Sequence, residues 1–204
     1  GFETLGNNTT GTNNTAVGRT SLGANTTGSN NAGIGKDALF ANTTGADNVA
    51  LGESSLLSNT TANYNTAVGK SALRVNTTGA NNTALGKGSL YANTTASNNT
   101  AVGYEALNAN TTGTQNVALG ALALDANTTA DNNTGVGYNS LTVNTTGTQL
   151  TALGAYSLQR NTTASYNTGV GYNTLGNTTT GDRNLAVGTS ALEANTTGES
   201  NTAL

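Results

Sequence analysis

Few side chains in this sequence could take part in acid–base or nucleophilic chemistry. The 204 residues contain no His and no Cys, which excludes zinc sites, disulfides, cysteine nucleophiles and histidine-containing triads. The ten acidic residues are scattered, and Glu53, Glu105 and Asp131 share no spacing that recurs along the chain. A glycosidase would need two carboxylates flanking the scissile bond. We therefore expect no enzyme, no catalytic residues, no metal and no cofactor.

Asparagine and threonine offer a second kind of chemistry. The chain holds 33 Asn and 41 Thr, and its eleven Asn-Thr-Thr triplets that recur in one register have the form of N-glycosylation sequons. A ladder of stacked Asn and Thr side chains would produce the same triplets, so both interpretations stay open. The candidate glycosylation sites are Asn25, Asn42, Asn59, Asn76, Asn93 and Asn110.

The charge pattern excludes two classes of partner. Seven Lys and Arg stand against ten Asp and Glu, for a formal net charge of -3, and no basic run offers a surface for nucleic acid or an anionic membrane. No apolar stretch approaches the ~20 residues of a membrane-spanning helix. We expect neither a nucleic-acid partner nor a membrane span.

A repeat of 17 residues must position all of these side chains. The Asn-Thr-Thr triplets recur in one register from Asn8 to Asn195, and only Thr178 departs from Asn there. Twelve blocks, from residues 1–17 to residues 188–204, fill the chain without insertion or deletion. Every block has Gly at position 1, Leu at position 5, Thr at positions 9 and 10, and Val, Ile or Leu at position 17. Positions 2, 3, 6, 12 and 13 vary among polar and charged residues and are expected to face solvent.

This unit is typical of a β-solenoid. It is shorter than helical repeats, which run to roughly 33–47 residues, and Asn, Thr and Gly are poor helix formers. Residues 65–69 alternate as a strand does, with Thr66 and Val68 on one face. We predict an all-β parallel β-roll of twelve coils, each with two short strands and two turns, forming a single domain over residues 1–204. Stacking at ~4.8 Å per coil gives a rod roughly 55 Å long.

Each position of the repeat becomes a column running along such a rod. The Leu at position 5 and the aliphatic residue at position 17 are expected to point inward, Asn amides to bond from coil to coil, and Gly at position 1 to adopt a φ that other residues avoid. The expected ladders include Leu22, Leu39, Leu73, Leu107, Asn25, Asn42, Asn76, Asn110, Thr26, Thr43, Gly18, Gly35, Gly69 and Gly103. Leu150, in an Asn column, and Arg160, in a column that is mostly Ala, predict local repacking.

The expected interior is thin, with two large apolar side chains per block. Burying a further face between chains would add stability, so we expect the chain to associate with itself, as a trimer or a filament. Solenoids normally end in capping repeats, and neither the first nor the last block is atypical. The array is therefore expected to be a window of a longer chain.

Two stretches carry a resemblance to a known group of proteins. NTAVGKSALRVNTTG (65–79) and NTAVGYEALNANTTG (99–113) resemble the repeats of bacterial and phage tail-fibre-domain proteins, which are often grouped with the head domains of YadA-like trimeric autotransporter adhesins. The adhesin head repeat is shorter, at about 14 residues. The resemblance implies a left-handed parallel β-roll, often trimeric, in an extracellular stalk, fibre or adhesin on a cell or virion surface.

The expected function is that of a structural component of an extracellular fibre, stalk or filament. An adhesin or tail-fibre surface that binds host glycans is the first alternative. Tyr104, Tyr138 and Tyr172 share position 2 at 34-residue spacing, as an aromatic stripe would, although duplication of a two-block unit explains the same spacing. Ice binding by Thr columns is a further alternative. It is weakened because adjacent Thr residues in a strand point to opposite faces.

Overall fold

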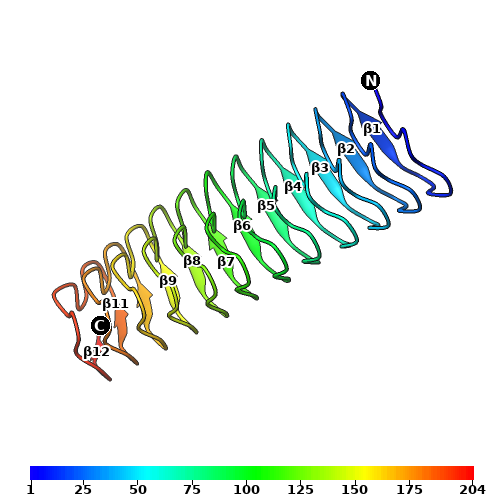
Figure 1. Ribbon diagram of the computed structural model, residues 1–204. Coiled ribbons are helices and arrows are strands. Elements are labelled where there is room, and N and C mark those ends of the chain that lie inside the picture. Colours follow the sequence, from blue (N-terminus) through cyan, green and yellow to red (C-terminus); the bar gives the residue numbers. More distant parts are fainter.

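The computed structural model covers residues 1–204 and confirms the β-solenoid. Every coil contributes one strand, and the twelve strands form a single parallel sheet in chain order, so that the ends of the chain lie at opposite ends of a rod (Figure 1). The strands are β1 (Thr15–Val17), β2 (Ala32–Ile34), β3 (Val49–Leu51), β4 (Thr66–Val68), β5 (Thr83–Leu85), β6 (Thr100–Val102), β7 (Val117–Leu119), β8 (Thr134–Val136), β9 (Thr151–Leu153), β10 (Thr168–Val170), β11 (Leu185–Val187) and β12 (Thr202–Ala203).

The register of the sheet follows the repeat. Thr66 pairs with Thr83, Ala67 with Ala84 and Val68 with Leu85, and all other strand pairs keep the same offset of 17 residues. Because no block carries an insertion, no strand slips, and equal positions of the repeat stack directly over one another.

The expectation of two strands per coil is wrong, because each coil has only one. Positions 3, 5 and 13 adopt a positive φ in every coil, as at Glu105 (51°), Leu107 (53°) and Gln115 (59°). These left-handed residues interrupt the extended backbone that a second strand would need. Coils are nevertheless bonded to each other outside the sheet: 110 of the 132 backbone hydrogen bonds lie outside the strands, including that from Leu107 N–H to the carbonyl of Ala123 (2.9 Å).

The interior holds one large apolar side chain per coil, not two, except in the coil where Leu150 is buried as well. Leu107 is fully buried against the small residues of positions 4 and 16, as at Ala106 and Ala101, within a core of 22 buried residues. The expectation that position 17 points inward is wrong, and Leu119 is 47% exposed. Neighbouring residues of a strand face opposite sides, so placing the Ala of position 16 inside turns positions 15 and 17 outward.

The glycines at position 1 allow the coils to approach closely. Gly18, Gly35, Gly69 and Gly103 have φ between 123° and 136°, a conformation that side chains disfavour. A Cβ on Gly103 would lie 2.5 Å from the carbonyl oxygen of the next coil's Gly120. The turn after each strand therefore requires glycine for both backbone conformation and space.

The described chain has no helix that is long and apolar enough to cross a membrane.

Candidate functional site

Two ladders of buried amides run along the inside of the rod. At position 8, Asn42 Nδ2 donates to Asn25 Oδ1 of the preceding coil (2.7 Å) and to the carbonyl of Gly45 in its own coil (2.9 Å). At position 14, Asn48 Nδ2 donates to the carbonyl of Ala62 (2.8 Å), and its backbone N–H donates to Asn31 Oδ1 (3.0 Å). The expected Asn ladder is confirmed, and the second column doubles it.

The position 8 ladder contains every candidate glycosylation site. Their side chains are fully buried, and each Nδ2 donates two hydrogen bonds; they are Asn25, Asn42, Asn59, Asn76, Asn93 and Asn110. A glycan on Nδ2 would replace one of its two N–H donors and could not fit inside the coil. Glycosylation there stays a prediction, and it would have to come before the coil closes.

Each amide ladder is interrupted once. Thr178 replaces Asn at position 8 and donates to the carbonyl of Asn195, which leaves Asn161 Oδ1 buried without a partner. Leu150 replaces Asn at position 14 and joins the hydrophobic core. It offers no acceptor to the backbone N–H of Asn167, a bond that the other coils make. Arg160 is exposed, outside the core.

The two Thr columns differ in exposure. Thr26 Oγ1 and Thr43 Oγ1, at position 9, donate to the carbonyls of the next coil (3.0 and 3.1 Å) and are partly buried. At position 10 every Thr is exposed, as Thr27 is, and none of their hydroxyls bonds to the protein. Of these two columns, only that of position 10 therefore presents free Thr hydroxyls to solvent in every coil.

Charged and aromatic side chains meet along positions 2 and 3. Glu53 lies between Lys70 (Oε2 to Nζ, 2.9 Å) and Lys36 (Oε1 to Nζ, 4.0 Å). The hydrogen bond and charge of Lys70 lower the pKa of Glu53. Lys87 Nζ stands 5.3 Å from the ring centroid of Tyr104. The hydrogen bond and charge of Glu105 raise the pKa of Tyr104.

Three tyrosines form a contiguous row further along this face. The ring centroids of Tyr138 and Tyr156 lie 5.4 Å apart, and those of Tyr156 and Tyr172 lie 5.7 Å apart, both edge to face. Tyr138 and Tyr172 are 47% and 54% exposed. Tyr156, at position 3, fills the gap between them, and the position 2 pattern alone does not identify it.

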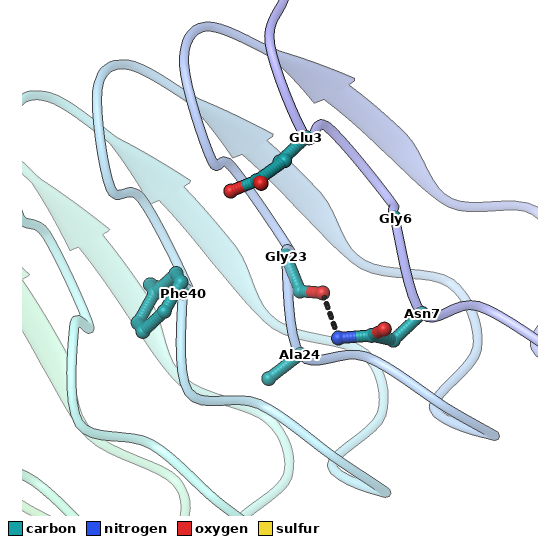
Figure 2. A pocket seen from close by; sticks show the side chains of 6 residues that line it. All are labelled: Glu3, Gly6, Asn7, Gly23, Ala24 and Phe40. Carbon is teal, nitrogen blue, oxygen red and sulfur yellow. Dashed lines mark hydrogen bonds between the residues drawn. The ribbon is translucent and has the colours of Figure 1, made fainter.

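The rod has one hollow, of about 430 Å³, on the surface of its first coils. Figure 2 shows Glu3 and Asn7 on one side and Phe40 on the other, with Gly23 between them and Asn7 Nδ2 donating to its carbonyl (2.9 Å). The hollow exists because two successive blocks have glycine at position 6, Gly6 and Gly23, where every later block except that of Gly176 carries a larger side chain. The hollow presents the carboxylate of Glu3 and one face of the Phe40 ring to a ligand.

The acidic side chains do not converge. Glu53 and Asp131 lie in separate parts of the rod, and no three acidic residues form a group that could hold a metal ion. Glu105 and Asp125 are close enough to interact, and burial, together with the charge of Glu105, raises the pKa of Asp125.

Comparison of the chain with protein families, curated proteins and solved structures found no match. The geometry itself therefore carries the functional argument. The invariant positions 1, 5 and 9, and positions 8 and 14, which are Asn in all blocks but one, bond or pack one coil to the next. The most variable positions lie on the surface.

Proposed function

We propose that this chain is a structural component of an extracellular fibre, stalk or filament, on a cell or virion surface, with no enzymatic activity. The observation that carries the proposal is the continuity of its ladders. Backbone bonds, two amide columns and a Leu column link successive coils along the described chain. Such a rod resists bending because every coil is bonded around most of its perimeter to the coils on both sides.

Composition and sequence resemblance support this location. The chain has no Cys or Met that an oxidising environment would modify, and no Pro that would interrupt the coil-to-coil bonds. Its NTAVG and NTTG stretches resemble repeats of fibre and adhesin proteins. The same resemblance supports a left-handed winding and a trimeric state as parts of the proposal.

The test is the shape and protease resistance of the isolated chain. Small-angle scattering or electron microscopy should show a straight rod roughly 55 Å long, with the coil region resisting proteases under native conditions. A flexible or rapidly digested chain would contradict the structural role.

Glycan binding is a second candidate, favoured by the tyrosine row. Aromatic rings that are half exposed and held by their neighbours are suitable for stacking against sugar rings. Electrophoresis in gels that contain hydroxyethyl cellulose or mannan should retard the chain, and Tyr138→Ala with Tyr172→Ala should abolish that retardation. Tyr64→Ala is the matched control, because Tyr64 is exposed in a different column. Equal loss in both variants, or no retardation at all, would remove this candidate.

A further inference from the structure

The outer face of the sheet carries aliphatic side chains that alternate in size. From β3 to β10, position 17 is Leu51, Val68, Leu85, Val102, Leu119, Val136, Leu153 and Val170. The four leucines are 37–47% exposed, whereas the four valines between them are only partly exposed. Since coils are spaced by ~4.8 Å, the leucines protrude every ~9.6 Å along the rod.

This face has no charge. None of the strand residues from β1 to β12 is Asp, Glu, Lys or Arg. Position 15 points to the same side; it is Thr in eight of the twelve coils and adds exposed aliphatic groups at Val49, Val117 and Leu185. An uncharged, partly aliphatic surface of a few hundred Å² along the rod is a patch of the size that often serves for binding.

The size of the face suits an interface between proteins. Eleven coil spacings of ~4.8 Å and three strand residues of ~3.3 Å give a strip of roughly 530 Å². Two such strips in contact would bury on the order of 1,000 Å² in total, which is the lower limit for a specific interface between proteins.

We propose that a second copy of this chain docks on this strip, with the leucines of each copy seated over the valines of the other and the two rods offset by one coil. The alternation identifies the partner, because a pattern of large and small residues with a two-coil period is complementary to the same pattern displaced by one coil. The inference rests on the proposed fibre function and states how neighbouring rods associate side by side.

The test is sedimentation velocity of the chain and of two charge variants. The wild-type chain should sediment as a species of at least twice its 20.2 kDa mass, and Leu85→Lys with Leu119→Lys should weaken association at least tenfold. The control, Thr78→Lys with Thr112→Lys, adds the same charges to exposed Thr residues of the same two coils on another face, and it should associate as the wild type does. Circular dichroism should be unchanged in both.

A third variant distinguishes interdigitation of the leucines and valines from non-specific hydrophobic association. Val102→Leu enlarges the apolar face, so non-specific association would become stronger, whereas interdigitated rods would associate more weakly because a leucine then meets a leucine. A wild-type chain that stays monomeric at ~100 μM, lysine variants that associate normally, or stronger association of Val102→Leu would each overturn the proposal. Scattering from the same samples reports the rod shape: single straight rods would contradict this interface and leave the fibre function standing, whereas loss of the rod would contradict both.

Discussion

At the scale of single residues, the rod depends on amides that satisfy each other. Each buried Asn of position 8 accepts from the next coil and donates to the preceding one, so an isolated substitution leaves a partner unsatisfied. That has happened at Thr178, where Asn161 Oδ1 has no hydrogen bond. An unpaired buried acceptor costs about 1–3 kcal/mol.

Restoring the amide at this position should stabilise the protein. Thr178→Asn is expected to donate to Asn161 Oδ1 and to the carbonyl of Gly181, as the other coils do, and to raise the free energy of unfolding by about 1 kcal/mol. Thermal unfolding followed by circular dichroism measures the change. Thr180→Asn, an exposed change in the same coil, should leave the melting temperature unaltered, and an equal rise in both would contradict the ladder explanation.

One carboxyl makes the stability depend on pH. Burial and Glu105 raise the pKa of Asp125 in the folded state, so the folded chain holds this proton more tightly than the unfolded chain does. The stabilisation from this group is present below its unfolded pKa and is lost as the pH rises through the folded pKa. Asp125→Asn should therefore raise the melting temperature at pH 7 and change it much less at pH 3. A variant whose advantage is the same at both pH values would show that ionisation of Asp125 is not responsible.

At the scale of the coil, the backbone is shaped by residues with positive φ. All twelve leucines of position 5 have φ near 50°, a conformation that costs a residue with a side chain roughly 1–2 kcal/mol. Burial of the leucine, which is complete in the ten inner coils, offsets this cost. The sequence does not predict this positive φ, because Leu is not among the residues that usually adopt a left-handed backbone conformation.

The two kinds of glycine in these coils should respond differently to alanine. Gly103→Ala introduces a Cβ against the backbone of Gly120 at a φ of 136°, and it should lower the melting temperature severely or prevent folding. Gly88→Ala meets only the flexible side chains of Glu105 and Asn108 at a φ of 69°, and other coils hold larger residues at this position. Its cost should be about 1 kcal/mol or less. Comparable losses in chemical denaturation would contradict the close-approach argument.

The coil also shows how far the sequence predicts the structure. The 17-residue period and the invariant columns suffice for the solenoid, its parallel register and its Asn ladder. The same argument fails at position 17, because apolar character alone does not show that a side chain is buried. The informative residue was its neighbour: position 16 is always Ala or Gly, as a narrow interior requires, and strand alternation then turns the aliphatic residue outward. The sequence pattern identifies only part of the tyrosine row, because Tyr156 occupies position 3 whereas Tyr138 and Tyr172 occupy position 2. The left-handed winding stays a prediction.

At the scale of the whole molecule, stability is shared between neighbouring coils. Every strand contacts only the strands before and after it in the chain, so interactions between adjacent coils must add along the rod. A single coil has one large buried side chain and cannot fold alone.

Removing one whole block should therefore shorten the rod and leave its cross-section intact. Deleting residues 103–119 joins Val102 to Gly120 in register, and scattering should report a folded rod shorter by ~4.8 Å with a slightly lower melting temperature. Deleting only residues 103–111 shifts every later column and should unfold the region around the junction. A whole-block deletion that unfolds the chain would contradict nearest-neighbour stability.

The interrupted amide column also determines how the rod yields under force. When tension pulls a coil away, its 17 residues extend to roughly 58 Å of contour, in place of the ~4.8 Å that they occupy in the stack. The boundary between the coils of Asn161 and Thr178 lacks an amide bond that most other coil boundaries have, so separating these two coils requires less work than separating two fully bonded coils. Under axial load we therefore expect a fibre to open at such interrupted boundaries at a lower force than at the fully bonded ones.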